Sequence, residues 1–305
     1  MVTRFDFDGI QAYELRSDAL AVTVMEYGAT LTGITFAGKK VGLGYDTMEE
    51  YRKGTAYLGA AIGRFANRIG KGRFTLNGRD YQVSVNENGN TLHGGAASYD
   101  VRLWHSEVIG DDAVKFTLHS PDGDNGFPGN LTAAVTYRVE GDTLTLTFEG
   151  DCDADTFYNP TSHMYFNLDA PKSVLETKVS INACGTLEVD GELIPTGTVL
   201  PLTADTDFTA PKKPAHYFDH CFVCGGDGVK ATAEGGGVKM TLTADYPALQ
   251  YYTGEFIGVP FGAGGGFAME PQFYPDGMNH EGFASGLLKA GEHFRKTATY
   301  HFEKA

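Results

Sequence analysis

A run near the middle of the chain gathers groups that could bind a ligand through hydrogen bonds. Between Asn159 and Leu168, a turn-forming Asn-Pro pair leads into alternating residues, with His163, Tyr165 and Asn167 on the polar parity. Because residues two apart in a β-strand lie on one face, the run predicts a strand with one apolar and one hydrogen-bonding face. Antiparallel sheets often turn a polar face to water, but a face of His, Tyr and Asn also suits the floor of a binding cleft.

A carboxyl group further along the chain has the surroundings of a general base. Glu270 ends the apolar run from 266 to 269 and precedes Pro271, which cannot donate a hydrogen bond in a sheet. Apolar surroundings raise the pKa of a carboxyl group because desolvation disfavours its charge, and such a Glu can act as a base near neutral pH. The glycines at 264 to 266 also suggest a phosphate loop, but neither a Lys-Ser/Thr pair nor a helix follows them.

Three other stretches hold polar side chains with two interpretations each. Arg64 and Arg68 stand among small residues, where they are either surface arginines of a loop or donors to ligand oxygens. His93 lies between Leu92 and two glycines, which let a backbone or a ligand approach closely; it is either a structural or a binding histidine. Asp219 precedes an apolar run, as a turn residue or as a carboxylate at the entrance of a strand.

The four cysteines indicate free thiols rather than a metal site or a disulfide framework. Cys221 and Cys224 have the spacing of a zinc knuckle, but no second Cys or His pair follows them. Residues three apart on a strand also face opposite ways. Cys152 and Cys184 are dispersed along the chain. We therefore predict no metal and no cofactor, and a cytoplasmic protein with reduced thiols.

The elements that must position these residues are mostly strands. Alternating runs rich in Thr, Val and aromatic residues, separated by Gly- and Asn-containing turns, predict half-buried strands. They are Leu31–Phe36, Val114–Leu118, Ala134–Val139, Thr143–Phe148, Lys239–Thr243 and Thr297–Phe302. The best helical stretch, Met48–Lys53, spans only a turn or two. Many short strands at close spacing predict an all-β fold in which large antiparallel sheets form a sandwich, and no linker or repeat divides residues 1–305.

The charge balance excludes several classes of partner. The chain of 305 residues has 39 acidic and 24 basic residues, for a formal net charge of −15. Nucleic-acid binding depends on Lys and Arg that neutralise phosphates, so we expect no nucleic-acid partner and no binding to an anionic membrane surface. No apolar run reaches the roughly 18 residues of a membrane span, and the first residues lack the apolar region of a secretory signal. The sequence leaves open whether the protein is a monomer or a homodimer.

Taken together, these stretches resemble segments of one known family. They are Gly-Arg-Phe-Ala-Asn-Arg-Ile at 63–69, Leu-His-Gly-Gly at 92–95, His-Met-Tyr-Phe-Asn-Leu at 163–168, Asp-His at 219–220 and Glu-Pro-Gln at 270–272. They occur in the order found in the aldose 1-epimerases, the galactose mutarotase family, and the chain resembles that family over about 200 residues. Ser162 departs from the Asn that more usually precedes the histidine, and residues 273–276 differ from the usual Phe-Pro-Asp continuation.

The resemblance implies a fold, an activity and a set of site residues. The fold would be the galactose mutarotase-like supersandwich, with the site in an open cleft on one sheet. The activity would be interconversion of the α and β anomers of free aldohexoses such as galactose and glucose. His163 would be the catalytic acid and Glu270 the catalytic base. The side chains implied to hold sugar hydroxyls are Arg64, Asn67, His93 and Asp219.

One carboxylate and one imidazole suffice for that chemistry, with no metal, nucleotide or covalent intermediate. Opening a hemiacetal ring needs a base for the proton of the C1 hydroxyl and an acid for the ring oxygen, and the same pair closes the ring on the other face of the aldehyde. Each proton-transfer group typically contributes about 10²- to 10⁴-fold to the rate. For the opening step His163 must start protonated and Glu270 ionised, so we expect their environments to move both pKa values toward the working pH.

Three alternative functions use the same residues. A non-catalytic sugar-binding sandwich needs no acid–base pair, so the presence of both His163 and Glu270 argues against it. An epimerase of phosphorylated hexoses needs clustered Lys and Arg at the cleft, which this acidic chain lacks. A glycoside hydrolase usually needs two carboxyl groups that flank the bond; Asp219 and Glu270 could serve, but His163 and Arg64 would then have no role.

Overall fold

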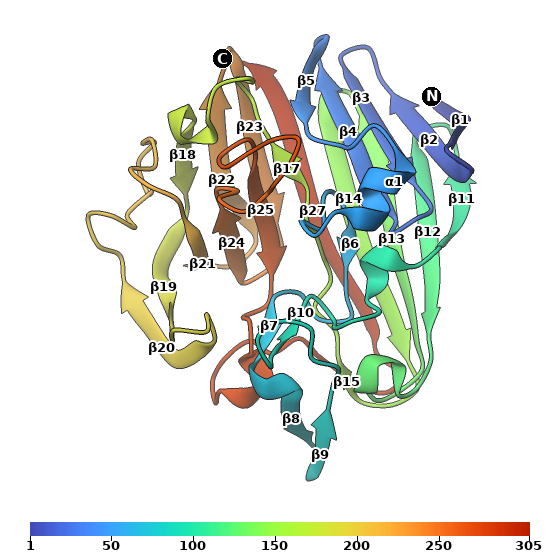
Figure 1. Ribbon diagram of the computed structural model, residues 1–305, viewed down its shortest axis with the longest axis vertical. Coiled ribbons are helices and arrows are strands. Elements are labelled where there is room, and N and C mark those ends of the chain that lie inside the picture. The colour runs from blue at the N-terminus through green and yellow to red at the C-terminus, as the bar shows by residue number, and fades with distance from the viewer.

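Short runs of alternating apolar and polar residues form strands throughout the chain, which a computed structural model describes from residue 1 to residue 305. Most of the strands belong to two large sheets that pack face to face (Figure 1). All pairings within both sheets are antiparallel, and the expected all-β sandwich is confirmed. The predicted helix is α1 (Met48–Lys53), whose capping box joins Thr47 and Glu50 through reciprocal hydrogen bonds.

The larger sheet has eleven strands and carries the residues singled out above. Its spatial order is β1 (Val2–Phe7), β2 (Ile10–Arg16), β3 (Leu20–Met25), β4 (Thr30–Phe36), β5 (Lys39–Gly42), β17 (Tyr165–Phe166), β25 (Phe267–Gln272), β24 (Ala248–Tyr252), β21 (Asp219–Cys224), β19 (Ala183–Val189) and β20 (Pro195–Pro201). Strands distant in sequence therefore meet at its centre, where β17 lies between β5 and β25.

The second sheet has eight strands and covers one face of the first. Its order is β11 (His105–Ile109), β12 (Ala113–Ser120), β13 (Leu131–Glu140), β14 (Thr143–Cys152), β27 (His293–Lys304), β23 (Val238–Ala244), β22 (Gly228–Gly235) and β18 (Lys178–Ile181). The runs predicted at 114–118, 134–139, 143–148, 239–243 and 297–302 all lie within these strands, and the run at 31–36 lies within β4. The predicted alternation is therefore correct at each of these places.

Four two-stranded ribbons and five short 3₁₀ turns complete the chain. The ribbons pair β6 (Ala61–Ile62) with β16 (Thr161–Ser162), β7 (Arg68–Ile69) with β10 (Thr91–Leu92), β8 (Arg73–Leu76) with β9 (Arg79–Gln82), and β15 (Thr156–Phe157) with β26 (Leu287–Leu288). The turns are η1 (Gly70–Gly72), η2 (Tyr99–Val101), η3 (Asp124–Gly126), η4 (Val174–Glu176) and η5 (Gly277–Asn279). No helix is long and apolar enough to cross a membrane.

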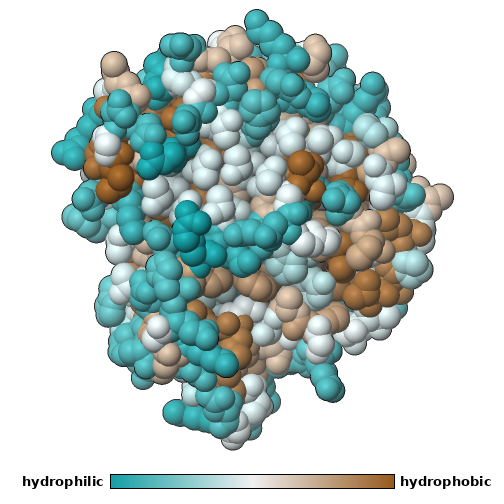
Figure 2. Space-filling view, turned by 180° about the vertical axis from the view of Figure 1, so that it is seen from behind, coloured by the Kyte–Doolittle hydropathy of each residue, from teal (hydrophilic) through white to brown (hydrophobic).

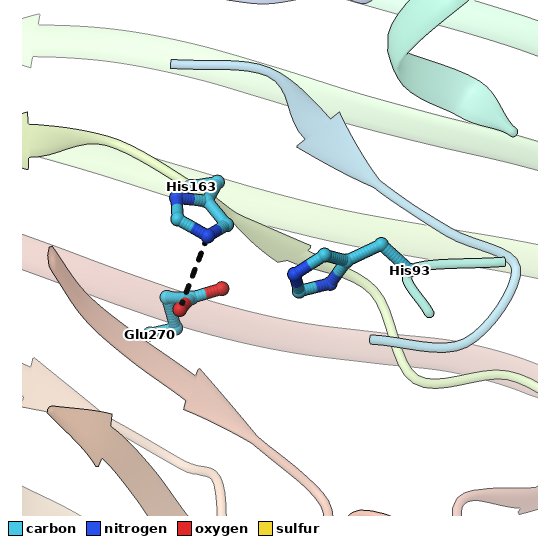
Figure 3. Close-up of side chains that lie close together, drawn as sticks. All are labelled: His93, His163 and Glu270. Atoms are coloured by element: carbon cyan, nitrogen blue, oxygen red, sulfur yellow. Dashed lines mark ion pairs between the residues drawn. The ribbon is translucent and has the colours of Figure 1, made fainter. Parts of the chain in front are cut away.

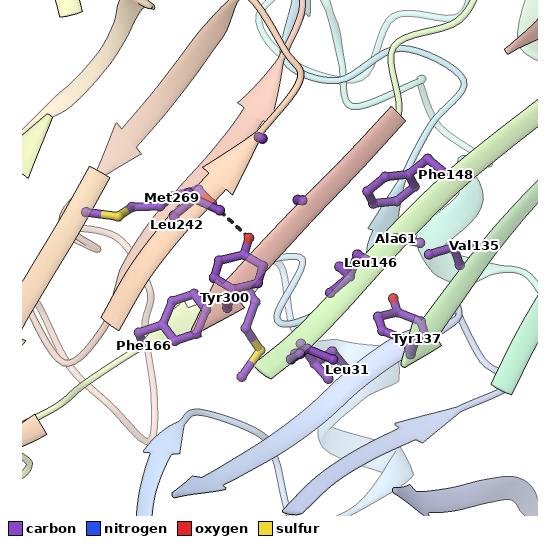
Figure 4. Packing of buried hydrophobic residues seen from close by; sticks show 14 of the residues in the cluster. Leu31, Ala61, Val135, Tyr137, Leu146, Phe148, Phe166, Leu242, Met269 and Tyr300 are labelled. Carbon is purple, nitrogen blue, oxygen red and sulfur yellow. Dashed lines mark hydrogen bonds between the residues drawn. The ribbon is translucent and has the colours of Figure 1, made fainter. Parts of the chain in front are cut away.

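The space between the two large sheets is filled by one apolar cluster of 52 buried residues (Figure 4). Several of its buried tyrosines have hydrogen-bonded hydroxyl groups, which offsets the cost of burying a polar group: Tyr137 donates to the carbonyl of Ala29, and Tyr300 donates to that of Met269. The surface seen from the opposite side is mostly polar, with apolar residues in separate small groups (Figure 2). The core thus takes one face of the eleven-stranded sheet and leaves the other available for a site.

The strand predicted from His163 to Leu168 is shorter than expected. His163 and Met164 lie between β16, which pairs with β6, and β17, which pairs with β5 and β25. The backbone changes partners at this point, so no continuous ladder forms. The predicted alternation of faces nevertheless holds for the apolar residues, because Met164, Phe166 and Leu168 all belong to the core cluster.

Candidate active site

The site lies on the outer face of the central strands of the larger sheet. In β25, Met269 points into the core, and Glu270 therefore points to the opposite face. Gln250 of β24 stands directly opposite Glu270 in the antiparallel register. Asp219 begins the next strand, β21, where its Oδ1 atom accepts a hydrogen bond from the Gln250 amide at 2.5 Å. The three side chains follow one another across three neighbouring strands.

A small ribbon outside the sheet supplies a histidine and an arginine. The β7–β10 ribbon pairs Arg68 with Leu92 and places His93 directly after it. Asn67 and His93 both have left-handed backbone conformations, with φ of 63° and 51°. Their backbones are joined because the His93 N–H donates to the Asn67 carbonyl at 3.0 Å. Gly94 allows this turn, since a Cβ atom there would lie 2.1 Å from the carbonyl oxygen of Gly63.

His163 and Glu270 meet at the bottom of the site (Figure 3). The Nε2 atom of His163 lies 3.6 Å from the Oε1 atom of Glu270, which is longer than an ordinary hydrogen bond. Both residues are buried, with exposed fractions of 5% and 2%. The second carboxylate oxygen of Glu270 and the Nδ1 atom of His163 have no hydrogen-bond partner in the protein. Buried polar atoms without a partner are unusual, and the Glu270 oxygen is available to a ligand.

Burial shifts the pKa values of the pair in opposite directions. Desolvation raises the pKa of Glu270 well above its ordinary value, and the negative charge of Asp219 adds to that effect. Desolvation also lowers the pKa of His163 to about 4. The first shift agrees with the expectation of a base tuned toward neutral pH. The second is contrary to the expectation for His163, because the same dry surroundings that disfavour a carboxylate also disfavour an imidazolium.

A cavity of about 350 Å³ opens above the pair. His163, Glu270, Asn67, His93 and Asp219 all line it, so five of the six predicted site residues come together. The other lining residues include Tyr57, Tyr165, Arg68, Gln250, Glu87 and Glu192. A larger hollow of about 470 Å³ lies over β1 to β5, but none of the predicted site residues lines it.

Arg64 is the exception, and its predicted role must be corrected. Its side chain does not line the cavity and is only 2% exposed. Its guanidinium donates to the backbone carbonyls of Ser120, Pro128 and Gly129 at 2.7 to 3.1 Å. These contacts bind its two terminal nitrogens to the loop that connects β12 and β13, away from the cavity. Arg68, four residues later, lines the cavity in its place.

Arg68 is already paired within the protein. Its Nε and Nη2 atoms donate to the two carboxylate oxygens of Glu87 at 2.6 and 2.8 Å. This bidentate geometry fixes the plane of the guanidinium. Arg68 is the only Lys or Arg among the lining residues, whereas Glu87, Glu192, Asp219 and Glu270 are all acidic. The cavity therefore offers a ligand many acceptors and few positive charges.

His93, His163 and Glu270 have the residue types of a metal site, but the ring proton of His93 is on the nitrogen that would have to bind the metal. One nitrogen from each of His93 and His163 and one oxygen of Glu270 lie within 4.8 Å of one another. However, the Asn67 backbone N–H donates to Nδ1 of His93 at 3.1 Å. The neutral imidazole must then carry its proton on Nε2, and burial keeps it neutral by lowering the pKa of His93. A metal-bound histidine usually donates from its second nitrogen, so His93 presents an N–H donor here instead of a lone pair.

Several residues at the site were not predicted from the sequence. Gln250 and Tyr57 lie in segments without an unusual pattern, and no signal in the sequence marked them. Asn167, predicted to share the polar face with His163, does not line the cavity; its amide donates to the carbonyls of Lys172 and Gly265. Ser162, the departure from the family pattern, is buried and does not line the cavity.

The two cysteines with knuckle-like spacing lie on opposite faces of β21, as expected. Cys224 belongs to the main core between the sheets, and Cys221 packs in a small cluster on the outer face. All four cysteines are free thiols.

Comparison with known proteins identifies the family. The model of the family described as aldose 1-epimerase matches residues 11–301 of the chain. The chain belongs to the aldose 1-epimerase family. It is 33% identical to a galactose mutarotase of Bos taurus, over 97% of this chain and 95% of the relative, and 35% identical to an aldose 1-epimerase of Escherichia coli, over 94% of both chains.

Solved structures of the aldose 1-epimerase family have the same fold. The structure of galactose 1-epimerase from Lactobacillus acidophilus superposes with a TM-score of 0.90 at 26% identity, covering 100% of this chain and 98% of that one. An aldose epimerase homologue from C. elegans superposes with a TM-score of 0.91 at 27% identity, covering 96% and 98%. Membership in this family makes the protein an isomerase that interconverts aldose anomers.

Proposed function

We propose that the protein interconverts the α and β anomers of free aldohexoses such as galactose and glucose, with Glu270 as base and His163 as acid. The observation that carries the proposal is the position of the pair: the two groups lie 3.6 Å apart at the buried end of a polar cavity. The C1 hydroxyl and the ring oxygen of a pyranose are bonded to one carbon, so two groups this close can reach both oxygens.

The proton movements balance with these two side chains alone. Ionised Glu270 takes the proton of the C1 hydroxyl while protonated His163 gives a proton to the ring oxygen, and the C1–O5 bond breaks. The products are an open aldehyde, a protonated Glu270 and a neutral His163. Rotation about the C1–C2 bond presents the other face of the carbonyl, and return of both protons closes the ring as the other anomer.

The pair thus shares one proton, which is on His163 in the ion pair and on Glu270 in the neutral pair. The ion pair opens the ring, and the neutral pair closes it. Burial favours the neutral pair, because it raises the pKa of Glu270 and lowers that of His163. Attraction between the opposite charges across 3.6 Å offsets part of that cost for the ion pair. Both arrangements are then accessible during one turnover.

We propose that the surrounding side chains hold the sugar hydroxyls. Asp219 accepts hydrogen bonds, and the Nε2–H of His93 donates one toward the catalytic pair. Asn67 and Arg68 line the wall of the cavity. We assign to Arg68 the role in holding a sugar hydroxyl that the family resemblance implied for Arg64.

A free sugar suits this cavity better than a phosphorylated one. A phosphate needs unpaired Lys or Arg donors, and the single lining cation, Arg68, is already bound by Glu87. The nearby carboxylates of Glu192 and Asp219 would repel a phosphate dianion. Glucose 6-phosphate should therefore be a much poorer substrate than glucose.

Polarimetry on freshly dissolved α-D-galactose, α-D-glucose, xylose, arabinose and fucose, with glucose 6-phosphate alongside, tests the proposal. We expect the enzyme to accelerate the approach to anomeric equilibrium for the free aldoses. If calorimetry detects sugar binding but the anomerisation rate stays at its spontaneous value for every sugar, the protein is a non-catalytic binder and the proposal is wrong. Action in the cytoplasm, and the choice between monomer and homodimer, stay predictions.

A further inference from the structure

We propose that Tyr57 is a positioning residue that holds the His163 imidazole in its catalytic orientation through ring contacts instead of a hydrogen bond. This inference rests on the proposed role of His163 in anomer interconversion. It starts from the unpaired Nδ1 atom of His163. Catalytic imidazoles are commonly oriented by a hydrogen bond at the second nitrogen, and no other residue supplies one here.

The turn that contains Tyr57 holds the backbone of His163 on both sides. The His163 N–H donates to the carbonyl of Ala60 at 3.0 Å, and the Gly59 N–H donates to the carbonyl of His163 at 2.9 Å. Tyr57 has a left-handed backbone, with φ of 53°. Gly59 could not be replaced, because a Cβ atom there would lie 1.9 Å from the carbonyl oxygen of Leu31. The turn is therefore fixed in a shape that directs the Tyr57 ring at the histidine.

Three rings surround the His163 imidazole. The Tyr57 ring lies 6.0 Å from it, centroid to centroid, with an interplanar angle of 27°. Tyr165 lies 4.9 Å away at 34°, and His93 makes an edge contact at 5.2 Å and 83°. Tyr57 also contacts His93, at 4.7 Å and 66°. Tyr57 is the only one of the two tyrosines that touches both imidazoles, so it couples their orientations.

The same contacts can support the charge that His163 must carry. A cation near the face of an aromatic ring is stabilised by the ring electrons, by an amount that corresponds to about a 3- to 30-fold change in an equilibrium. The ionisable groups that face His163 are Glu270 from β25, His93 from the β10 loop, Tyr57 and Tyr165. Only Glu270 among them stabilises an imidazolium by charge, so the two phenol rings supply the remaining favourable contacts.

Replacement of Tyr57 tests the inference. Tyr57→Asn removes the ring while keeping a residue that tolerates the left-handed backbone; Tyr57→Phe keeps the ring. We expect Tyr57→Asn to lower kcat about 3- to 30-fold with KM changed less than about threefold, and Tyr57→Phe to stay near wild type. Tyr81→Leu is the matched control, because it removes another half-buried tyrosine that packs on Phe74 and does not line the cavity.

NMR of the histidine ring protons gives a readout that does not depend on activity. His163→Asn assigns the His163 signals. In the wild type we expect them to be shifted upfield by the neighbouring rings, and in Tyr57→Asn to lose part of that shift and to titrate at a lower pH. The same measurement stands if no mutarotation is detected, so failure of the proposed function is distinguishable from failure of this inference.

The outcomes separate the possibilities. Unshifted His163 signals in the wild type overturn the inference even if Tyr57→Asn does not fold. A folded Tyr57→Asn with wild-type kcat and wild-type His163 titration also overturns it. Loss of kcat in both Tyr57→Asn and Tyr57→Phe assigns the effect to the hydroxyl group, and the ring-positioning proposal is then wrong.

Discussion

The sharpest prediction concerns Glu270→Gln, which removes the proposed base and keeps its shape. The Oε2 atom of Glu270 has no partner in the protein, and the Nε2 atom of the His163 imidazole lies 3.6 Å from Oε1, beyond an ordinary hydrogen bond. The substitution therefore breaks no hydrogen bond that supports the fold. An amide cannot accept the proton of the C1 hydroxyl, so the loss should fall on the chemical step.

The expected size of the loss follows from the role of one proton-transfer group. General bases contribute typically about 10²- to 10⁴-fold, which is roughly 3 to 6 kcal/mol of transition-state stabilisation at about 1.4 kcal/mol per tenfold. The change leaves in place Asp219 and His93, which we propose to hold sugar hydroxyls. We therefore expect kcat to fall by 10²-fold or more while KM stays within a few-fold of wild type.

The assay is polarimetry of fresh α-D-galactose, with the spontaneous rate subtracted from each trace. A Glu270→Gln enzyme that retains kcat within about tenfold of wild type would contradict the assignment of the base. The neutral amide should be easier to bury than a carboxylate, so we expect the melting temperature not to fall. Loss of activity together with a melting temperature far below that of wild type would show a structural role instead.

The pH dependence of stability provides a second check on the same variant. The pKa of Glu270 is raised in the folded protein above its ordinary value of 4.5, so the folded state keeps a proton that the unfolded state releases. Stability from this group is present below about pH 4.5 and is lost as the pH rises. Chemical denaturation at several pH values should therefore show Glu270→Gln gaining stability relative to wild type as the pH increases. A difference in unfolding free energy between the two proteins that stays constant with pH would refute the raised pKa of Glu270.

Three further predictions concern the other side chains. His163→Asn should lower kcat by about 10²- to 10⁴-fold in the same assay, with its circular dichroism spectrum unchanged; wild-type turnover would exclude His163 as the acid. Arg68→Met should raise KM about tenfold or more through loss of a charged donor, whereas Arg64→Met should leave KM unchanged and lower the melting temperature by leaving three buried carbonyls unpaired. The reverse pattern would restore Arg64 as the sugar ligand. Calorimetry with Zn²⁺ should give the same affinity for wild type and His93→Gln, because the His93 Nε2 atom carries a proton; tighter binding to wild type would contradict that tautomer.

Comparison of the two arginines shows where sequence reasoning was insufficient. Both stand in one seven-residue segment, and nothing in their types or neighbours distinguishes a ligand-binding guanidinium from a structural one. The distinction comes from two distant parts of the chain. The loop between β12 and β13 surrounds Arg64 with carbonyl oxygens, and the pairing of β7 with β10 turns Arg68 toward the cavity.

Tyr57 and Gln250 illustrate the same limit. Gln250 becomes part of the site because the register of β24 places it opposite Glu270, and Tyr57 because its turn is bonded to the backbone of His163. Strand register and contacts between turns depend on residues that are far apart in the sequence, so they leave no local pattern in the chain.

The amino-acid sequence by itself indicated the all-β class, six of the strands with their alternating faces, and the chemical types of the proposed acid and base. It could do so because alternation of apolar and polar residues is a local property that the pleat of a strand converts directly into two faces. Tertiary structure alone decided that His163 and Glu270 lie 3.6 Å apart, which arginine lines the cavity, and how deeply the pair is buried from solvent. Distance and desolvation depend on residues more than a hundred positions apart meeting across a sheet, and only the folded chain brings them together.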